Sequence, residues 1–296
     1  MEKGVILIAI NCDSYKKGKL SFYGKLAYNM ANSIKKHSNT HITVLTDDNC
    51  LDGINKSVFD NVIKVDIKEY FDQGVINPLK LKPKIYDYSP YDRTIYLDVD
   101  GLNISKERSL DSLFDLLKDS EFEIQEVGRY KKQDYAKCHM VWVSKVGKDI
   151  RDIYNAYNIP DENLYPEYNS SFIYFKKNQV NLKFFKQVRD NYIDRRLEWK
   201  DMGGRYPDEL AFNLASTQLK HYNTIEGFKP IFFQWENDSD RLKGVKPISE
   251  KHWFLGMAGG YHFPRLRRLY DSITKAQGSP YHKKCFQSRD KMFHMR

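Results

Sequence analysis

The sequence predicts an α/β protein of the Rossmann-like type, a single domain built on a mainly parallel, mixed central sheet. Three observations indicate this class. Strand-like and helix-like segments alternate through the first half of the chain. No linker rich in Gly, Pro or Ser divides the 296 residues, and 41% of them are hydrophobic, which is enough for a sizeable core. We therefore expect the functional residues at the carboxyl ends of the parallel strands.

The individual elements follow from the spacing of apolar residues. Short, mostly apolar runs predict buried strands, and apolar residues three or four positions apart, such as Leu26, Met30 and Ile34, predict helices. The predicted strands are residues 5–11, 41–45, 62–65, 94–97, 140–143 and 171–175, and the predicted helices are 23–37, 109–118, 182–192 and 208–218.

The composition excludes a membrane-spanning helix. The longest purely apolar run is the six residues Val5 to Ile10, whereas crossing a bilayer takes about 20. The N-terminus has no signal-peptide pattern. The four cysteines are too dispersed for a zinc or redox motif, so we expect unpaired thiols in a reducing, cytoplasmic compartment. The four cysteines are Cys12, Cys50, Cys138 and Cys285.

The positive charge is concentrated at the C-terminal end. The net charge is +9, and residues 241–296 hold 13 Lys and Arg against 3 Asp and Glu, so the rest of the chain is nearly neutral. Such a region indicates an anionic partner, for example nucleotide phosphates or nucleic acid, or else a solvated basic face. We expect one domain over residues 1–270 and a basic extension over 271–296.

A pair of carboxylates follows the predicted strand at 94–97. Strand alternation would turn Asp98 and Asp100 to the same side, where they could bind magnesium or manganese. Such a metal can hold a diphosphate as a leaving group. A simple turn is the alternative, because Asp and Gly both favour turns.

Two enzyme classes have such a pair at a strand end. Haloacid-dehalogenase phosphatases have Asp-x-Asp-Gly, which 98–101 is similar to, but on their first strand and usually followed by Thr or Val, where this chain has Leu102. Nucleotide-sugar glycosyltransferases of the GT-A type have Asp-x-Asp about a hundred residues in. The position of Asp98 favours the second class.

Several segments in order make the chain resemble the glycogenin-like retaining glycosyltransferases, family 8 of the GT-A fold, over residues 4–270. Residues 13–20 resemble the segment around the uracil base, and 33–37 and 43–47 the helix and strand that complete the nucleotide pocket. Lys82 precedes Asp98 by sixteen residues, as does a family lysine that reaches the donor. Asn169-Ser170-Ser171 is similar to an Asn-Ser-Gly motif that contacts the sugar, and 208–213 to a helix start, Asp-Gln-x-x-x-Asn, near the reacting centre.

The sequence departs from this pattern at three places. Ser171 replaces the Gly of Asn-Ser-Gly, and Glu209 replaces a Gln. The third metal ligand, a His in the family, has two candidates. We prefer His262, which Phe follows directly, and keep His252 as the alternative.

The resemblance implies a transferase that uses Mn²⁺ or Mg²⁺ and a nucleotide-diphosphate sugar, with UDP as the expected nucleotide and retention at the anomeric carbon. The implied metal ligands are Asp98, Asp100 and His262. Asp208, Asn169 and Lys82 are implied at the reacting centre. The implied donor-binding residues are Ile10, Asn11, Tyr15, Asp47, Lys82, Asp98, Val99, Asp100, Asn169, Ser170, Asp208, Arg267 and Arg268.

The partner of this chemistry stays open at the level of sequence. A glycan, a protein, a lipid-linked molecule or a modified DNA base could be the acceptor, and self-glycosylation is a further alternative. Rival functions are a phosphatase of the dehalogenase class that uses residues 98–101, and a nucleic-acid-binding protein that uses the basic C-terminal residues.

Overall fold

The computed structural model describes residues 2–11, 20–72, 74–137, 150–194, 208–233, 248–257 and 264–281. They divide into two compact units. What we call the parallel unit draws on residues 3–65, 97–119 and 230–296, and the antiparallel unit on residues 1–2, 66–96 and 120–229. Each unit is described by itself.

The parallel unit contains three parallel strands in the order β3-β2-β1. They are β1 (Lys3–Ala9), β2 (His41–Thr46) and β3 (Asn61–Lys64). Helix α1 (Phe22–Lys35) links β1 to β2 and begins at Ser21, whose hydroxyl accepts a hydrogen bond from the Gly24 N–H. Because Ala9 pairs with Thr46, the residues that follow β1 and β2 leave the sheet at the same edge.

A smaller sheet in the same unit has the order β10-β11-β7. Its strands are β10 (Ile231–Phe232), β11 (Phe254–Gly256) and β7 (Gly101–Asn103), with β11 antiparallel to β7. Helices α3 (Leu110–Leu116) and α9 (Pro264–Ala276) and the 3₁₀ turn η1 (Lys56–Val58) complete the unit. Helix α1 packs against both β1 and β7, so it lies between the two sheets of this unit.

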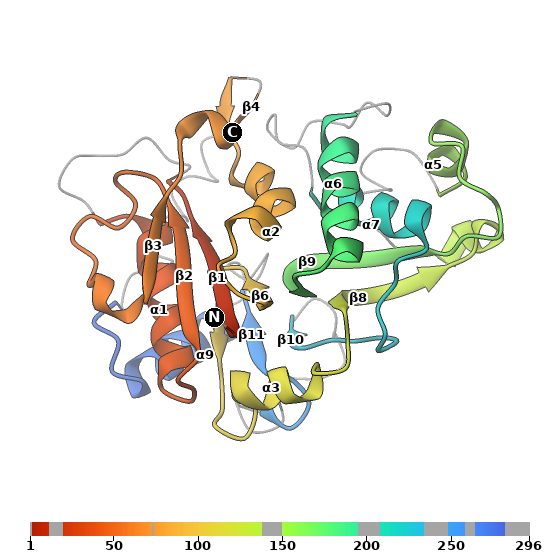
Figure 1. Cartoon of the computed structure of the whole chain (residues 1–296). Helices are drawn as coiled ribbons and strands as arrows, with labels where there is room; N and C mark the ends of the chain where they lie inside the picture. The colour runs from red at the N-terminus through yellow and green to blue at the C-terminus, as the bar shows by residue number, and fades with distance from the viewer. Residues whose placement is uncertain are drawn as a thin grey trace. The chain divides into compact units, whose positions relative to one another are not determined.

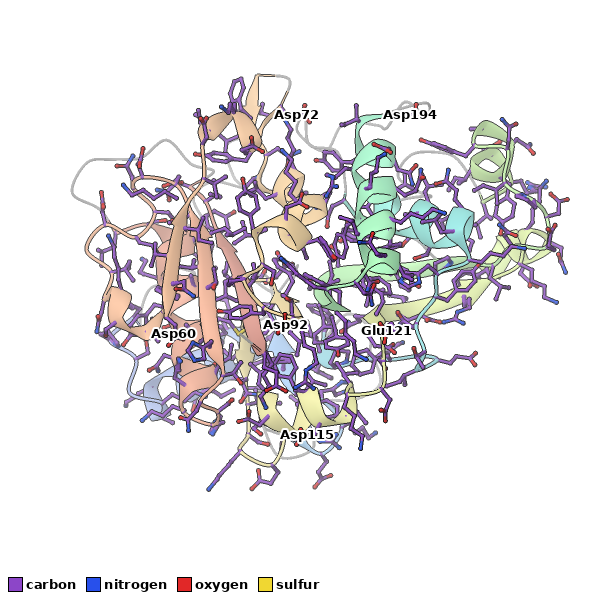
Figure 2. All side chains as sticks on the ribbon, viewed as in Figure 1. Asp60, Asp72, Asp92, Asp115, Glu121 and Asp194 are labelled. Carbon is purple, nitrogen blue, oxygen red and sulfur yellow. The ribbon has the colours of Figure 1, made fainter. Side chains whose placement is uncertain are left out.

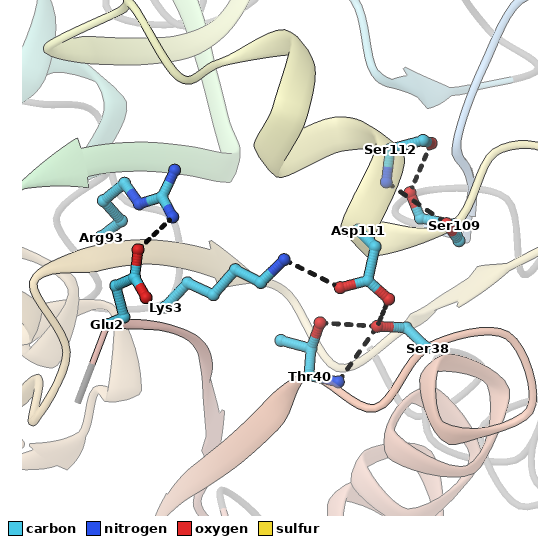
Figure 3. Close-up of polar contacts among 8 residues, drawn as sticks. All are labelled: Glu2, Lys3, Ser38, Thr40, Arg93, Ser109, Asp111 and Ser112. Carbon is cyan, nitrogen blue, oxygen red and sulfur yellow. Dashed lines mark hydrogen bonds and ion pairs between the residues drawn. The ribbon is translucent and has the colours of Figure 1, made fainter.

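A polar cluster lies at the end of this unit where β1 begins, opposite the carboxyl ends of the parallel strands (Figure 3). The Lys3 ammonium pairs with Asp111 of α3 at 3.0 Å, and the Ser38 hydroxyl donates to the same carboxylate at 2.8 Å. Burial opposes ionisation of Asp111, but these two hydrogen bonds outweigh it and lower its pKa. The cluster fastens the start of β1 to α3.

The antiparallel unit is built on the long pair β8 (Phe122–Tyr130) and β9 (Tyr165–Lys176), and β6 (Arg93–Leu97) lies beside β9. Helix α6 (Gln179–Ile193) packs on α7 (Asp208–Leu219), which packs on β9 (Figure 1). Shorter elements are the hairpin of β4 (Phe71–Asp72) and β5 (Val75–Ile76), helices α2 (Ile85–Tyr88) and α5 (Ile150–Ala156), and the 3₁₀ segments η2 (Ile67–Glu69), η3 (Pro78–Lys84) and η4 (Lys132–Lys137).

The core of this unit is aromatic. Phe184 and Phe185 of α6 are fully buried and contact rings from β8, β9 and α7, among them Phe122, Phe175 and Phe212. Edge-to-face and tilted rings of this kind add a specific geometry to the burial of apolar surface. At the surface, Glu121, which immediately precedes β8, pairs with Lys176 of β9 (Figure 2).

The predicted α/β class with a mainly parallel, mixed sheet is confirmed. The predicted strands at 5–11, 41–45, 62–65, 94–97 and 171–175 and all four predicted helices correspond to observed elements. Residues 140–143 lie outside the described part of the chain. The predicted boundary at 270 falls inside α9, and the division into a domain and an extension stays a prediction. Within the described residues, no helix is both long and apolar enough to cross a membrane.

Strand β8 was not predicted, because three of its buried residues are polar. Glu123, Gln125 and Glu126 are all buried, so the strand lacks the apolar run that marks its neighbours. The Glu123 carboxylate accepts hydrogen bonds from the N–H groups of Thr224 and Ile225 at 3.0 and 3.1 Å. These backbone donors stabilise a carboxyl group at a core position where a strand usually has an apolar side chain.

Glu123 should make the stability of the protein depend on pH. Desolvation by burial raises its pKa from 4.5 to about 7. Between these values the folded chain keeps a proton that the unfolded chain has lost, so stability falls as the pH rises through this range. The loss amounts to about 3 kcal/mol by pH 8. Urea unfolding of the wild type and of Glu123→Gln at pH 5 and pH 8 measures it, and Glu123→Gln should lose much less. Identical pH profiles would contradict the assignment.

Candidate active site

The carboxylate pair occupies the turn between β6 and β7. Strand β6 ends at Leu97, and β7 begins at Gly101, directly after Asp100. Strand alternation therefore does not orient the two carboxylates, because the strand ends before the pair begins, and their facing the same side stays a prediction. Asp98 and Asp100 are both half-buried, whereas Val99 between them is buried. The turn thus keeps two carboxylates partly accessible beside an apolar anchor.

Gly101 is required by close packing. A Cβ added to Gly101 would lie 2.8 Å from Met30 Cε of α1 and 3.2 Å from the main-chain oxygen of Leu255 in β11. The end of the flexible Met30 side chain can move, but the main chain of β11 is held by its pairing with β7. The simple-turn explanation of Asp-x-Asp-Gly, in which Gly serves the turn, does not account for these contacts.

Substitution of Gly101 by Ala is expected to destabilise the parallel unit by about 1–3 kcal/mol, the usual cost of overpacking a well-filled site. The reason is that β7 must move away from Met30 and Leu255 to admit the methyl group. Urea unfolding would measure the loss as a lower midpoint with an unchanged slope. An unchanged midpoint would show that this packing is loose.

The pairing of β7 with β11 places the turn that carries the Asp pair beside the end of β11, and the choice between the two candidate histidines stays a prediction. Gly256 pairs with Gly101, and the Met257 N–H donates to the Asp100 carbonyl at 3.0 Å. His252 lies before the other end of β11, where its ring contacts Phe232. Five positions along the chain separate it from Met257. His262 follows Met257 by five residues and lies outside the described residues, as does Tyr15.

At the carboxyl edge of β1 and β2, the predicted donor residues Asn11 and Asp47 contact each other. Asp47 accepts the Asn11 N–H at 2.6 Å through one oxygen and the N–H groups of Asn49 and Cys50, at 2.8 and 2.6 Å, through the other. The Asn11 side-chain oxygen accepts from the Ser21 hydroxyl at the start of α1. Asp47 therefore shapes the loops after both strands, a structural role that the sequence did not reveal.

Four predicted donor residues remain. Ile10 follows β1 and Val99 lies in the turn between β6 and β7, whereas Arg267 and Arg268 belong to α9. Ile10 and Val99 are buried, so a role of their side chains in binding a donor has no support from exposure. Arg267 is half-buried and Arg268 is exposed, both near the start of α9. Leu266 and Ile273 of the same helix are buried, which fits the apolar side that their spacing indicates.

In the antiparallel unit, three predicted residues form a buried polar cluster. The Lys82 ammonium donates to the Ser170 hydroxyl at 3.0 Å and lies 3.4 Å from Asp208 Oδ2. The Ser170 hydroxyl donates to the same carboxylate oxygen at 2.5 Å. Lys82 is 4% exposed and Asp208 is 1% exposed. Asp208 Oδ1 has no hydrogen-bond partner among the described residues, so the cluster offers a buried acceptor.

The local backbone explains how Ser170 reaches this cluster. Ile124 and Gln125 are neighbours on β8 but pair with Ile173 and Asn169 on β9, so residues 170–172 form an irregular bulge. Bulges redirect side chains and are common beside functional sites. Asn169 Oδ1 accepts the Ser171 N–H at 3.0 Å and supports the bend. Asn169 of the Asn-Ser-Ser motif thus pairs with β8, and its two serines belong to the bulge.

Burial separates Lys82 from the lysines beside it. Lys80 donates to the Phe71 carbonyl on the β4–β5 hairpin, and Lys84 pairs with Glu69. Lys82 alone of the three is buried, and its ammonium also lies over the Tyr96 ring, 5.5 Å from its centroid. These contacts, which the sequence spacing could not reveal, favour Lys82 as the functional lysine.

Solved structures share this architecture. The galactosyltransferase LgtC in complex with donor and acceptor sugar analogues aligns with a TM-score of 0.56 and 13% identity, over 93% of this chain and 95% of that chain. An active-site variant of LgtC gives 0.51 and 14%, over 91% and 95%. The bifunctional WbbM glycosyltransferase gives 0.55 and 13%, over 97% of this chain and 51% of WbbM. This chain has the GT-A glycosyltransferase fold.

The likeness lies in the fold, because the identities are low. No family model and no curated protein sequence matches the chain. The GT-A fold agrees with the position of the Asp pair after β6 and gives no support to the dehalogenase alternative, in which the motif follows the first strand. The described residues contain no group of three metal-binding side chains, so Asp98 and Asp100 stand as a pair in this part of the chain.

Proposed function

We propose that this GT-A protein is a metal-dependent, retaining glycosyltransferase that takes a sugar from a nucleotide-diphosphate donor, with UDP as the nucleotide. The observation that carries the proposal is the half-buried Asp98–Asp100 turn, whose last carbonyl is bonded to the end of β11. On this fold, the turn supplies two carboxylates with defined backbone support.

The chemistry of these donors fits Mn²⁺ or Mg²⁺. Carboxylate oxygens suit hard divalent cations, and neutral imidazole is a good additional ligand for manganese. Asp98, Asp100 and His262 would hold the ion, with His262 preferred over His252 because Phe263 follows it directly, as in the family pattern. The bound ion would offset negative charge on the diphosphate leaving group.

The remaining roles belong to side chains of this chain. Asn11, Asp47 and Tyr15 would frame the base and ribose. Arg267 and Arg268, near the start of α9, would bind phosphate oxygens through their planar, forked donors. Lys82 would add positive charge beside the donor. Asn169, Ser170 and Asp208 would orient the sugar, with Asp208 Oδ1 as the acceptor for a sugar hydroxyl.

The reaction would proceed at one face of the sugar. The acceptor hydroxyl attacks the anomeric carbon from the side that the diphosphate leaves, and a phosphate oxygen takes its proton. This route needs no enzyme nucleophile, and it agrees with the retention that the family resemblance implies. A glycan, a protein, a lipid-linked molecule or a modified DNA base are the acceptors to be tested.

Donor hydrolysis is the most direct test of this function. Purified protein incubated with Mn²⁺ and a panel of sugar nucleotides should slowly release one nucleoside diphosphate, detected by mass spectrometry, without any acceptor. Release from a UDP-sugar that stops on chelation of the metal supports the proposal. Phosphate release from simple esters, with no sugar-nucleotide turnover, contradicts it and favours a phosphatase.

A further inference from the structure

Buried polar side chains connect α1 to α9 inside the parallel unit. Asn29 of α1 is fully buried. Its amide nitrogen donates to the Tyr270 hydroxyl of α9 at 3.3 Å, and its amide oxygen accepts from the Ser279 hydroxyl at 2.5 Å. One asparagine thus contacts both α9 and the segment that follows this helix.

The end of α9 is joined to β7 in a similar way. Gln277 is buried, and its side-chain amide donates to the main-chain carbonyl of Asn103 at 3.1 Å. The main-chain carbonyl of Gln277 accepts from the side-chain amide of Asn32 at 3.2 Å. The Asn103 N–H in turn donates to the Ser33 hydroxyl at 2.9 Å. Two neighbouring sets of hydrogen bonds therefore join α1 to α9 and its following segment, and one of them includes β7.

These hydrogen bonds join two parts of the proposed donor site. Strand β7 begins immediately after Asp100. Arg267 precedes Tyr270 by three positions on α9, so the two side chains lie on neighbouring positions of one helical face. The anchor of α9 is therefore about one turn from the arginine that would bind the diphosphate.

Hydrogen bonds at these positions restrict α9 more than apolar contacts would. Leu266 and Ile273 pack α9 against the unit, but apolar contacts are non-directional and tolerate small slides and rotations. A buried amide favours its particular partners, because a donor or acceptor that loses its partner inside the protein is not compensated by water. The hydrogen bonds thus favour a single register for α9.

We propose that Asn29 and Gln277 are positioning residues for the donor diphosphate. By fixing the register of α9 on α1 and β7, they hold Arg267 in a constant place relative to Asp100. This inference rests on the proposed function, since it assumes that Arg267 contacts the diphosphate.

A double-mutant cycle on nucleotide binding tests the inference. Isothermal titration with UDP in the presence of Mn²⁺, and with uridine as the probe that lacks phosphate, would be carried out on the wild type, Asn29→Ala, Arg267→Ala and the double variant. Asn29→Ala is expected to weaken UDP binding about tenfold and to leave uridine binding unchanged. In the Arg267→Ala background, Asn29→Ala should have little further effect, because its target is already absent.

The control is Ser38→Ala, which removes a buried hydroxyl from the separate cluster with Thr40 and Asp111 (Figure 3). It should lower stability without changing UDP affinity. Should Asn29→Ala fail to fold, Tyr270→Phe, which removes only the hydroxyl that Asn29 contacts, decides the question by the same cycle.

The outcomes separate the two proposals. A wild-type protein that does not bind UDP overturns the proposed function. If the wild type binds UDP, the inference alone is overturned by unchanged affinity in Asn29→Ala, by an equal loss of uridine binding, or by losses that add fully to those of Arg267→Ala.

Discussion

Replacement of Asp100 by Asn is expected to lower metal-dependent sugar transfer by roughly 10²–10³-fold, the scale expected when a charge that stabilises the leaving group is no longer held in place. The fold should survive, because Asp100 is half-buried and the bond that ties it to β11 is made by its main-chain carbonyl. Circular dichroism would verify the fold, and nucleoside diphosphate release at several Mn²⁺ concentrations would measure the loss.

Asp115→Asn is the matched control. Asp115 is an exposed carboxylate on α3 in the same unit (Figure 2), so its neutralisation alters the net charge equally without touching the turn. Activity in this variant should equal that of the wild type. Full activity in Asp100→Asn would rule out a metal site at the turn.

Replacement of Lys82 by Met is expected to damage both stability and turnover. The methionine keeps most of the side-chain stem but leaves the Asp208 carboxylate buried without its cation. Breaking a buried ion pair from one side typically costs about 3–5 kcal/mol, and urea unfolding would show a loss of this size. Turnover at saturating donor should also fall, because the proposed reaction needs positive charge beside the diphosphate.

A second substitution separates the two effects. In Lys82→Met with Asp208→Asn, no buried charge is left unpaired, so much of the stability should return, while turnover stays below that of Asp208→Asn alone. Lys84→Met serves as the control, because its partly exposed pair with Glu69 is of a kind worth about 1 kcal/mol or less. Turnover in the double variant equal to that of Asp208→Asn alone would show that Lys82 acts only through stability.

Local periodicity predicted five of the strands and four of the helices in the described part of the chain. The apolar run at β1 and the three-and-four spacing in α1 each reflect which side of a short segment is buried. The same pattern failed at β8, where buried Glu123 is held by the backbone of Thr224 and Ile225. Hydropathy cannot foresee a polar core position whose partners lie a hundred residues away.

Site residues show the same division. The types and order of Asp98, Asp100 and Asp208 were readable, because carboxylates at strand and helix ends are local features. The choice of Lys82 over Lys80 and Lys84 was not, since it depends on which ammonium meets Ser170 and Asp208. A useful signal was present in α1, where Asn29 and Ser33 interrupt the apolar positions of an otherwise amphipathic helix.

The sequence by itself therefore determined the fold class, the strands and helices with a clear apolar period, and the residue types available for donor chemistry, because these follow from local spacing and composition. Only the tertiary structure decided which side chains meet. The bulge in β9 brought Ser170 to Lys82, and the hydrogen bond between Asn29 and Tyr270 joined α1 to α9. Each depends on contacts between distant segments, which form only when the chain packs.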